Sequence, residues 1–174
     1  MSHDESFQHS LWELIKDIRF AMLTHRHADG TLHAHPLTTQ NRSLHPGEPL
    51  YFFVSKKTEL GQRLRADGKV CVAYADPNKD RYVSISGQAK ISEDLATKRR
   101  LFNALNKAWF PDGAEDTNLE LAEVTIEYAE YWNVKEGKTT QLLKMARAAV
   151  SGHPPEIGEH REMRVGSPET VAHE

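Results

Sequence analysis

A basic, hydroxyl-rich turn is the first stretch in which residue types and spacing suggest chemistry. The apolar run at residues 50–54 is typical of a buried strand, and Ser55, Lys56, Lys57 and Thr58 follow it, ahead of a short helical pattern. Where such a turn opens a helix, free backbone N–H groups, hydroxyl donors and ammonium groups converge, and this favours anions. We predict that the turn holds the phosphate of a cofactor. Taken alone, the stretch also fits a solvated basic surface loop, which is the commoner occurrence.

Four histidines flank a hairpin signal. His25 and His27 precede residues 29–30, an Asp-Gly pair, and His33 and His35 follow it. If the Asp-Gly pair alone forms the loop, the two histidine pairs point to opposite faces of the sheet. If the loop begins one residue earlier, His25 lies opposite His33, and only this register permits a metal site. No supporting carboxylate is obvious, so we predict structural or solvent-exposed histidines and no metal.

Aromatic residues form a third candidate group, because a flat ring system needs aromatic or apolar walls. Trp109 lies in the loop WFPDG, and an aromatic side chain in a loop often borders a pocket or a partner. Trp132 stands near the end of a predicted strand and is expected in the core or an interface. No GxSxG, GxGxxG or GxxxxGK[ST] motif occurs, so we identify no catalytic residue.

Composition bounds the class of protein. The 174 residues suit a single domain, and the net charge of −3, from 22 basic and 25 acidic side chains, argues against a nucleic-acid-binding surface. No apolar run approaches the roughly 20 residues of a membrane span, and the N-terminus lacks the pattern of a signal peptide. The one cysteine, Cys71, fits a reducing compartment, so we expect a cytoplasmic protein without a membrane segment.

Hydrophobic periodicity predicts a mainly β domain over residues 1–150, followed by a loose tail over residues 151–174. A helix capped by Ser10 is expected first, and Gly87, in the middle of a strand, suggests a bulge or a close neighbour. The short helices and hairpin-linked strands indicate an antiparallel barrel with peripheral helices. Strands are expected at residues 20–27, 31–40, 50–55, 69–75, 81–92 and 121–134, and helices at 11–19, 58–65 and 94–107 and from about 139.

The ordered segments together resemble one family. Along residues 11–134 the chain shows FAMLTHRHADGTLHAHPLTTQ, PLYFFVSKKTEL, KVCVAYADPNKDRYVSISGQAKI, WFPDG and AEYWNV after the first helix. This order is similar to that of the pyridoxamine 5'-phosphate oxidase-like FMN-binding split barrels, and most of all to their general stress protein branch. The resemblance implies a six-stranded antiparallel split β-barrel that forms a homodimer, with FMN in a groove between the two subunits.

The resemblance also implies a set of cofactor-binding residues. The second hairpin strand, the strand at residues 50–55 and the turn after it would supply phosphate and ring contacts, and the partner subunit would supply the rest. Carried over by position, the first group is His35, Pro36, Leu37, Thr38, Phe53, Val54, Ser55, Lys56, Lys57 and Thr58, and the second group is Ser86, Gln88 and Trp109. Gln88 suits a hydrogen bond to the edge of the flavin ring.

Two departures from the family pattern bear on function. Family members often carry an arginine where His35 stands and a lysine near Leu60, so Lys56 and Lys57 would have to replace these charges. After Trp132 the chain lacks the arginine–histidine pair with which the vitamin oxidases hold their substrate phosphate. Pyridoxamine phosphate oxidase activity is therefore not expected.

The resulting expectation is a cytoplasmic FMN-binding homodimer of the general stress kind. It would act with an unidentified electron donor or small-molecule substrate, and it would bind neither nucleic acid nor membranes. One alternative is a flavin oxidoreductase that reduces a small molecule, as FMN reductases do. The other is a haem- or metal-binding stress protein that uses the hairpin histidines.

Overall fold

Antiparallel hydrogen bonding between neighbouring strands builds the body of the protein, in the order β2-β1-β4-β5-β6-β3. The computed structural model describes residues 3–133, 138–154 and 159–164. The strands are β1 (Ala21–Arg26), β2 (Leu32–Leu37), β3 (Leu50–Ser55), β4 (Lys69–Asp76), β5 (Arg81–Ser92), β6 (Leu119–Asn133) and β7 (Glu159–Arg164). The helices are α1 (His3–Ile15), α2 (Glu59–Ala66), α3 (Leu95–Leu101), the 3-10 turns η1 (Ala104–Ala108) and η2 (Gly113–Glu115), and α4 (Lys138–Ser151).

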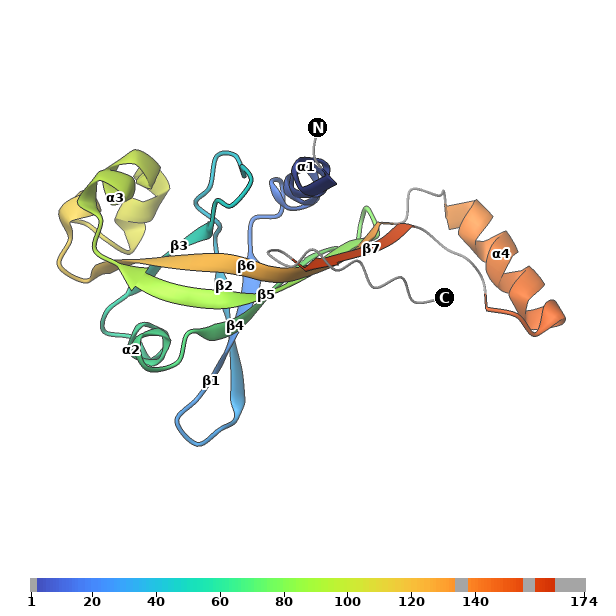
Figure 1. The fold of residues 1–174 in the computed structure, drawn as a ribbon, viewed down its shortest axis with the longest axis horizontal. Helices are drawn as coiled ribbons and strands as arrows, with labels where there is room; N and C mark the ends of the chain where they lie inside the picture. The colour runs from blue at the N-terminus through green and yellow to red at the C-terminus, as the bar shows by residue number, and fades with distance from the viewer. Residues whose placement is uncertain (1–2, 134–137, 155–158, 165–174) are drawn as a thin grey trace.

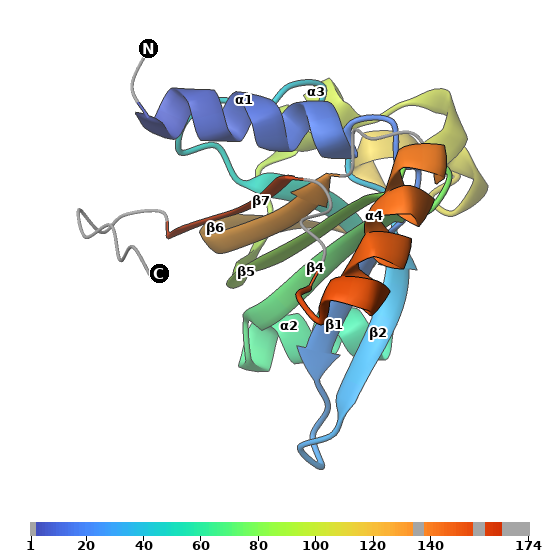
Figure 2. The ribbon, with the colours of Figure 1, turned by 90° about the vertical axis from the view of Figure 1, so that its right-hand side faces the viewer.

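The sheet curls until its two terminal strands approach each other (Figures 1 and 2). Thr39, just after β2, forms an isolated antiparallel bridge with Phe52 of β3, and the backbone N–H of Gln40 donates to the carbonyl of Tyr51 at 2.8 Å. Among the described strands nothing else pairs with that edge of β3, so the closure is partial and leaves a half-barrel. The predicted fold class, a mainly β, six-stranded antiparallel split barrel with peripheral helices, is confirmed.

One apolar core fills the concave side of the curled sheet. Successive side chains of a strand point to opposite faces, so every second residue of the strands faces inward. Leu11 and Ile15 of α1 join this core, and the ring of Phe7 lies 5.6 Å from that of Tyr131 on β6. Fully buried members from the strands are Leu23, Phe52, Val72, Ile85 and Val124.

Gly87 combines both properties that its position in a strand suggested. The register between β5 and β6 shifts between Ser86 and Gly87, which marks a bulge or irregularity. A Cβ atom at Gly87 would lie 2.1 Å from the carbonyl oxygen of Thr125, far inside van der Waals contact. Only glycine therefore lets the two strands approach so closely at this point.

The first helix begins earlier than expected. Ser10 was predicted to cap a helix over residues 11–19, but α1 runs from His3 to Ile15 and includes it. The hydroxyl of Ser10 donates to the carbonyl of Ser6 at 2.9 Å, one turn back. The prediction of a cap is wrong because a serine inside a helix can bond to the preceding turn in the same way that a cap bonds to the next one.

Two further segments differ from the expected elements. The helix expected at residues 94–107 ends at Leu101, and Asn103 starts the separate turn η1 through a capping box with Asn106. Within the tail predicted to be loose, residues Glu159–Arg164 form β7, which pairs with the second half of β6. The rest of that tail beyond β7, residues 165–174, lies outside the described residues.

α4 stands apart from the half-barrel, at the right-hand end of Figure 1. Its Leu142, Leu143 and Met145 side chains are exposed. Of the helices in the described ranges, none combines the length and apolar content that crossing a membrane requires. The buried core includes none of the described side chains of α4.

Replacing Gly87 by alanine should destabilise the fold, because the new methyl group meets the backbone of Thr125. We expect a loss of about 2 kcal/mol in the free energy of unfolding, more than the ~0.5–1 kcal/mol that alanine gains over glycine within a strand. Urea denaturation followed by circular dichroism measures it. Lys90→Ala, on the exposed face of the same strand, is the matched control and should stay within about 0.5 kcal/mol. Equal midpoints for the two variants would show that the backbones are not in close approach.

Candidate functional site

The basic turn (residues 55–58) owes its shape to hydrogen bonds that Ser55 and Thr58 make within it. The backbone N–H and the hydroxyl of Thr58 both donate to the carbonyl oxygen of Ser55, at 3.0 and 2.7 Å. The hydroxyl of Thr58 also accepts from the backbone N–H of Gly61 at 3.3 Å, so Thr58 is the N-cap of α2. The Ser55 hydroxyl accepts from the backbone N–H of Lys57 at 3.3 Å. These bonds leave the hydroxyl proton of Ser55 free to reach a ligand.

The lysines of the turn present their charges outward. The backbone N–H of Lys56 donates to the carbonyl of Asn118 at 2.8 Å, which ties the turn to the loop before β6. The side chains of Lys56 and Lys57 are exposed, and in the part of the chain that the structure describes neither has a carboxylate partner. Two unpaired ammonium groups beside the N-terminal end of a helix fit a dianion such as a phosphate group.

A close approach and an ion pair with a buried carboxylate fix α2 against the sheet. A Cβ atom at Gly61 would lie 2.6 Å from the carbonyl oxygen of Ser55, so glycine allows the helix to start directly against the strand end. On β6, Glu120 is only 2% exposed, and its carboxylate accepts from the guanidinium of Arg65. This hydrogen bond raises the pKa of Arg65. The turn is therefore held from both ends of the helix.

Two contacts, one at each end of β2, place its predicted site residues between β3 and the start of α2. At one end Thr39 bridges Phe52, and at the other the ring of His33 approaches Glu59, the first residue of α2. Between these two contacts lie His35, Pro36, Leu37 and Thr38. The half-buried His35 and Leu37 alternate with the exposed Pro36. The structure thus brings the predicted β2 residues and the basic turn to the same opening of the half-barrel.

Phe53 reaches that opening through its backbone, whereas the backbone groups of Val54 face β6. Both side chains are buried: Val54 belongs to the main core, and Phe53 packs in a second cluster with Leu101 and Phe110. Among the described strands, the edge of β3 beyond Phe52 lacks a pairing partner. Backbone groups of Phe53, and not those of Val54, are therefore the ones that a ligand in the opening could meet.

Ser86, Gln88 and Trp109 lie away from the turn within one chain. Ser86 and Gln88 alternate with the buried positions of β5 and so lie on the outer face of the sheet. Gln88 lines a shallow pocket of about 450 Å³ with Gly68 and Lys90, near the C-terminal end of α2. Trp109, 71% exposed, follows η1. Their assignment to the site of a partner subunit remains a prediction.

The hairpin adopts the register that brings the histidines together, with His25 opposite His33. His25 is 1% exposed, and burial lowers its pKa, so its imidazole is held in the neutral form. Its Nε2 atom lies 3.1 Å from Nε2 of His35, and their rings stack at a centroid distance of 5.1 Å. His27 and His33 stack at 4.6 Å. All four hairpin histidines (His25, His27, His33 and His35) therefore share the inner face.

Thr31 and Asp29 lock the hairpin loop and hold one of these rings. The backbone N–H and the hydroxyl of Thr31 both donate to Oδ1 of Asp29, at 2.9 and 2.6 Å, and these bonds lower the pKa of the Asp29 carboxyl. The Thr31 oxygen also lies 3.2 Å from Nε2 of His33. The loop thus fixes the orientation of the His33 ring.

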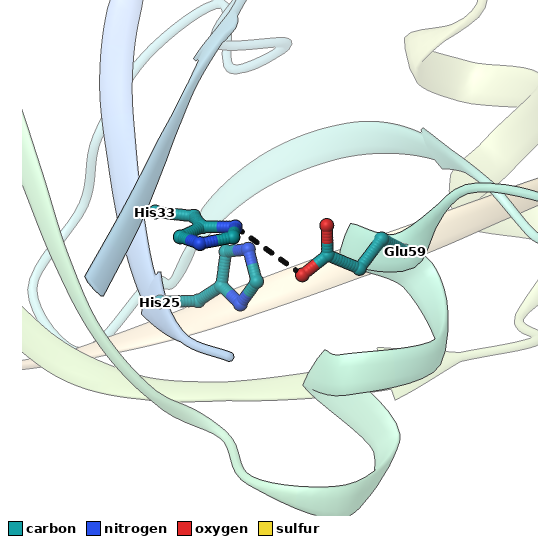
Figure 3. Close-up of side chains that lie close together, drawn as sticks. All are labelled: His25, His33 and Glu59. Carbon is teal, nitrogen blue, oxygen red and sulfur yellow. Dashed lines mark ion pairs between the residues drawn. The ribbon is translucent and has the colours of Figure 1, made fainter. Parts of the chain in front are cut away.

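Glu59 is the residue of this cluster that sequence reasoning missed. No supporting carboxylate was obvious from the sequence, but Oε1 of Glu59 lies 3.1 Å from Nε2 of His27 and 3.4 Å from Nδ1 of His33. Figure 3 shows His25 and His33 projecting from the hairpin toward Glu59 at the start of α2. An acidic residue in the first turn of a helix was visible in the sequence, but helix stabilisation explains such a residue fully.

A curled, partly closed antiparallel barrel with a basic turn beside its opening defines a protein of the split-barrel class. The chain belongs to the pyridoxamine 5'-phosphate oxidase-like family, because the model of that family, described as "Pyridoxamine 5'-phosphate oxidase like", matches residues 6–156. The predicted family is therefore confirmed.

Two solved structures and one curated protein are similar to this chain. The general stress FMN/FAD binding protein from the phytopathogen Xanthomonas citri is 32% identical, with a TM-score of 0.65 over 76% of this chain and 92% of that one. A general stress protein 26 from Jannaschia sp. CCS1 is 21% identical, with a TM-score of 0.69 over 91% and 98% of the two chains, and supports the fold. Protein bli-3 of Neurospora crassa is 23% identical over 125 residues, which are 67% of this chain and 60% of the length of bli-3.

Removing Arg65 should loosen α2, because Glu120 would be left charged and buried without its partner. We expect Arg65→Met to lower the urea midpoint clearly, whereas Arg63→Met, on the same helix and with only a backbone acceptor, should change it little. The double variant Arg65→Met/Glu120→Met should recover much of the loss, since it removes both charges together. Additive effects of the two single substitutions would contradict the coupling.

Proposed function

We propose that this protein binds FMN, with the phosphate at the basic turn and the ring system along the opening between β2 and β3. The observation that carries the proposal is the pair of unpaired ammonium groups, on Lys56 and Lys57, beside the N-terminal end of α2 at that opening. The relative from Xanthomonas citri, 32% identical over 76% of this chain, is an FMN/FAD binding protein, which supports a flavin as the ligand.

Each group of the turn has a distinct role toward the phosphate. Lys56 and Lys57 supply charge, the free hydroxyl proton of Ser55 supplies a hydrogen bond, and Thr58 holds the end of the helix so that its unused N–H groups point the same way. When bound, the flavin supplies the redox chemistry, and the protein positions it and shields it from water. We propose a redox role on this basis, with an electron donor or small-molecule substrate not yet identified.

Two positions at which family members often carry arginine or lysine have neither here, so phosphate binding would depend on Lys56 and Lys57. His35 stands where many family members have an arginine, and its ring stacks on the buried His25 instead of carrying a fixed charge outward. Leu60 stands near a family lysine, and it is buried in the core, 3% exposed. Lys56 and Lys57 are therefore the cations that remain for a dianion at this end of α2.

The double substitution Lys56→Ala/Lys57→Ala should weaken FMN binding by about tenfold or more, because charge-assisted hydrogen bonds to the phosphate are lost. Riboflavin has the same ring system without the phosphate, so its affinity should stay unchanged. Quenching of flavin fluorescence in a titration measures both affinities. Lys16→Ala/Lys79→Ala, with the same loss of charge at exposed positions on other surfaces, is the matched control.

Two outcomes would overturn parts of the proposal. An equal loss of affinity for FMN and riboflavin would place the phosphate away from the basic turn. If the unsubstituted protein bound neither, a flavin would be ruled out as the ligand. The same samples separate the two redox hypotheses. Bleaching of bound flavin by reduced nicotinamide would indicate a flavin oxidoreductase, and bleaching by dithionite alone would indicate a flavin-binding protein.

We also propose that two copies of the chain pair through the outer face of the sheet. An antiparallel sheet normally turns polar residues to the solvent, but here Met22, Tyr82 and Trp132 are exposed on that face. Cross-strand neighbours include Met22 with Ala73 and Tyr82 with Trp132, so the apolar side chains lie side by side. A second copy with the same surface would cover this area by two-fold symmetry. It would also carry the outer-face residues Ser86 and Gln88 into the interface.

Ala73→Arg should convert the dimer into a monomer, because it sets like charges at the centre of the proposed interface. Light scattering coupled to size-exclusion chromatography should give the mass of two chains for the unsubstituted protein and of one chain for the variant. Ala96→Arg, at an exposed position on α3, is the control and should stay dimeric. A monomeric unsubstituted protein would exclude this interface.

A further inference from the structure

We propose that His25, His33 and Glu59 form a binding site for a divalent transition metal ion of the zinc type. One potential ligand atom from each of these residues lies within 4.8 Å of the others. The three residues come from β1, β2 and the start of α2, so an ion would join both strands of the hairpin to the helix (Figure 3). The proposal does not depend on flavin binding.

The hydrogen bonds of the hairpin loop determine which nitrogen of His33 is available. The hydroxyl of Thr31 donates to Asp29 at 2.6 Å, so its oxygen is an acceptor toward Nε2 of His33 at 3.2 Å. Nε2 then carries the ring proton, and Nδ1 presents a lone pair. This lone pair faces Oε1 of Glu59 at 3.4 Å. Two acceptor atoms face each other at that distance, an arrangement that a cation between them would stabilise.

Two buried atoms of the cluster lack the partners that buried polar atoms normally have. Oε1 of Glu59 has two histidine nitrogens near it, Nε2 of His27 and Nδ1 of His33, yet it accepts no hydrogen bond within the described residues. Nδ1 of His25 is likewise buried without a hydrogen-bond partner there. Buried polar atoms without a hydrogen-bond partner are rare in native structures, and each calls for an explanation such as a bound ion. A metal ion would satisfy both residues at once.

Donor types and supporting contacts indicate which metals would fit. Imidazole nitrogens combined with one carboxylate oxygen favour Zn²⁺, Cu²⁺, Ni²⁺ or Co²⁺ over Mg²⁺ and Ca²⁺, which prefer oxygen ligands. Tetrahedral zinc ligands lie about 3.3 Å apart, which the 3.4 Å between His33 and Glu59 already matches. The Asp29–Thr31 pair orients His33 in the manner of an outer-sphere support. The ligand atom of His25 lies within 4.8 Å of the other two, so the His25 ring would turn toward the ion to complete the set.

Hydrogen bonding of His25 with His35, and the approach of His27 to Glu59, complete the surroundings of the site. His35 stacks on His25 and is the nearest candidate for a fourth ligand, a place that water can equally take. A cluster that holds an ion differs from an ion-free cluster of the same groups in one measurable property, since only the first binds a metal stoichiometrically.

The test is titration of the untagged full-length protein with Zn²⁺ by calorimetry, and with Co²⁺ by visible absorption. We expect one ion per chain and, for cobalt, the intense absorption of a tetrahedral site. Glu59→Gln and His33→Gln should each lower the zinc affinity by about tenfold to a hundredfold. The chain has 10 histidines, so His153→Gln, at an exposed position, is the matched control and should bind as the unsubstituted protein does.

Folding and the flavin proposal are checked with the same variants. Zinc should raise the thermal midpoint of the unsubstituted protein and of His153→Gln, but not of Glu59→Gln, whose circular dichroism should remain native. Lys56→Ala/Lys57→Ala should keep its zinc affinity, so the failure of one proposal is visible separately from the failure of the other. Absence of stoichiometric binding, or equal affinity in the Glu59→Gln variant, would overturn the metal site.

Discussion

The ion pair between Arg65 and the buried Glu120 is the interaction on which the candidate site depends. It connects the last turn of α2 to β6, while Gly61 lets the first turn lie directly against the end of β3. A carboxylate buried in the wall of a barrel is costly to leave unpaired, so the helix has little freedom to move away. The basic turn and Glu59 therefore occupy fixed places relative to the curled sheet.

The start of α2 carries positive side chains on one side and a negative side chain on the other. Lys56 and Lys57 point to the solvent side of the turn, where an anion is favoured, and Glu59 points to the hairpin histidines, where a cation is favoured. The two proposals thus use different side chains of one short segment. Their proximity also means that a metal ion at Glu59 would reduce the negative charge that a bound phosphate meets nearby.

The fold was largely predictable from local patterns, whereas the site was predictable only in part. The bounds of β3 and β5 follow from uninterrupted alternating or apolar runs, and the bulge at Gly87 follows from the one residue type without a side chain. The role of Glu59 was hidden because its contact with His33 exists only after the sheet curls and brings α2 to the hairpin. Ser10 was mispredicted because a serine can cap a helix or bond within one, and the local sequence fits both. β7 was missed because a strand with few apolar residues forms only beside a partner strand that is already in place.

The length of β6 gives β7 a further structural role. The first half of β6 pairs with β3 on the side away from β5, and its second half, from Tyr128 to Asn133, pairs with β7 instead. Both flanks of this central strand are thus occupied along nearly its whole extent. A shortened chain lacking β7 would expose a row of free peptide groups there, and exposed rows of this kind act as templates for uncontrolled association between molecules. β7 covers these groups and presents its own edge instead, and its charged side chains oppose further strand pairing there.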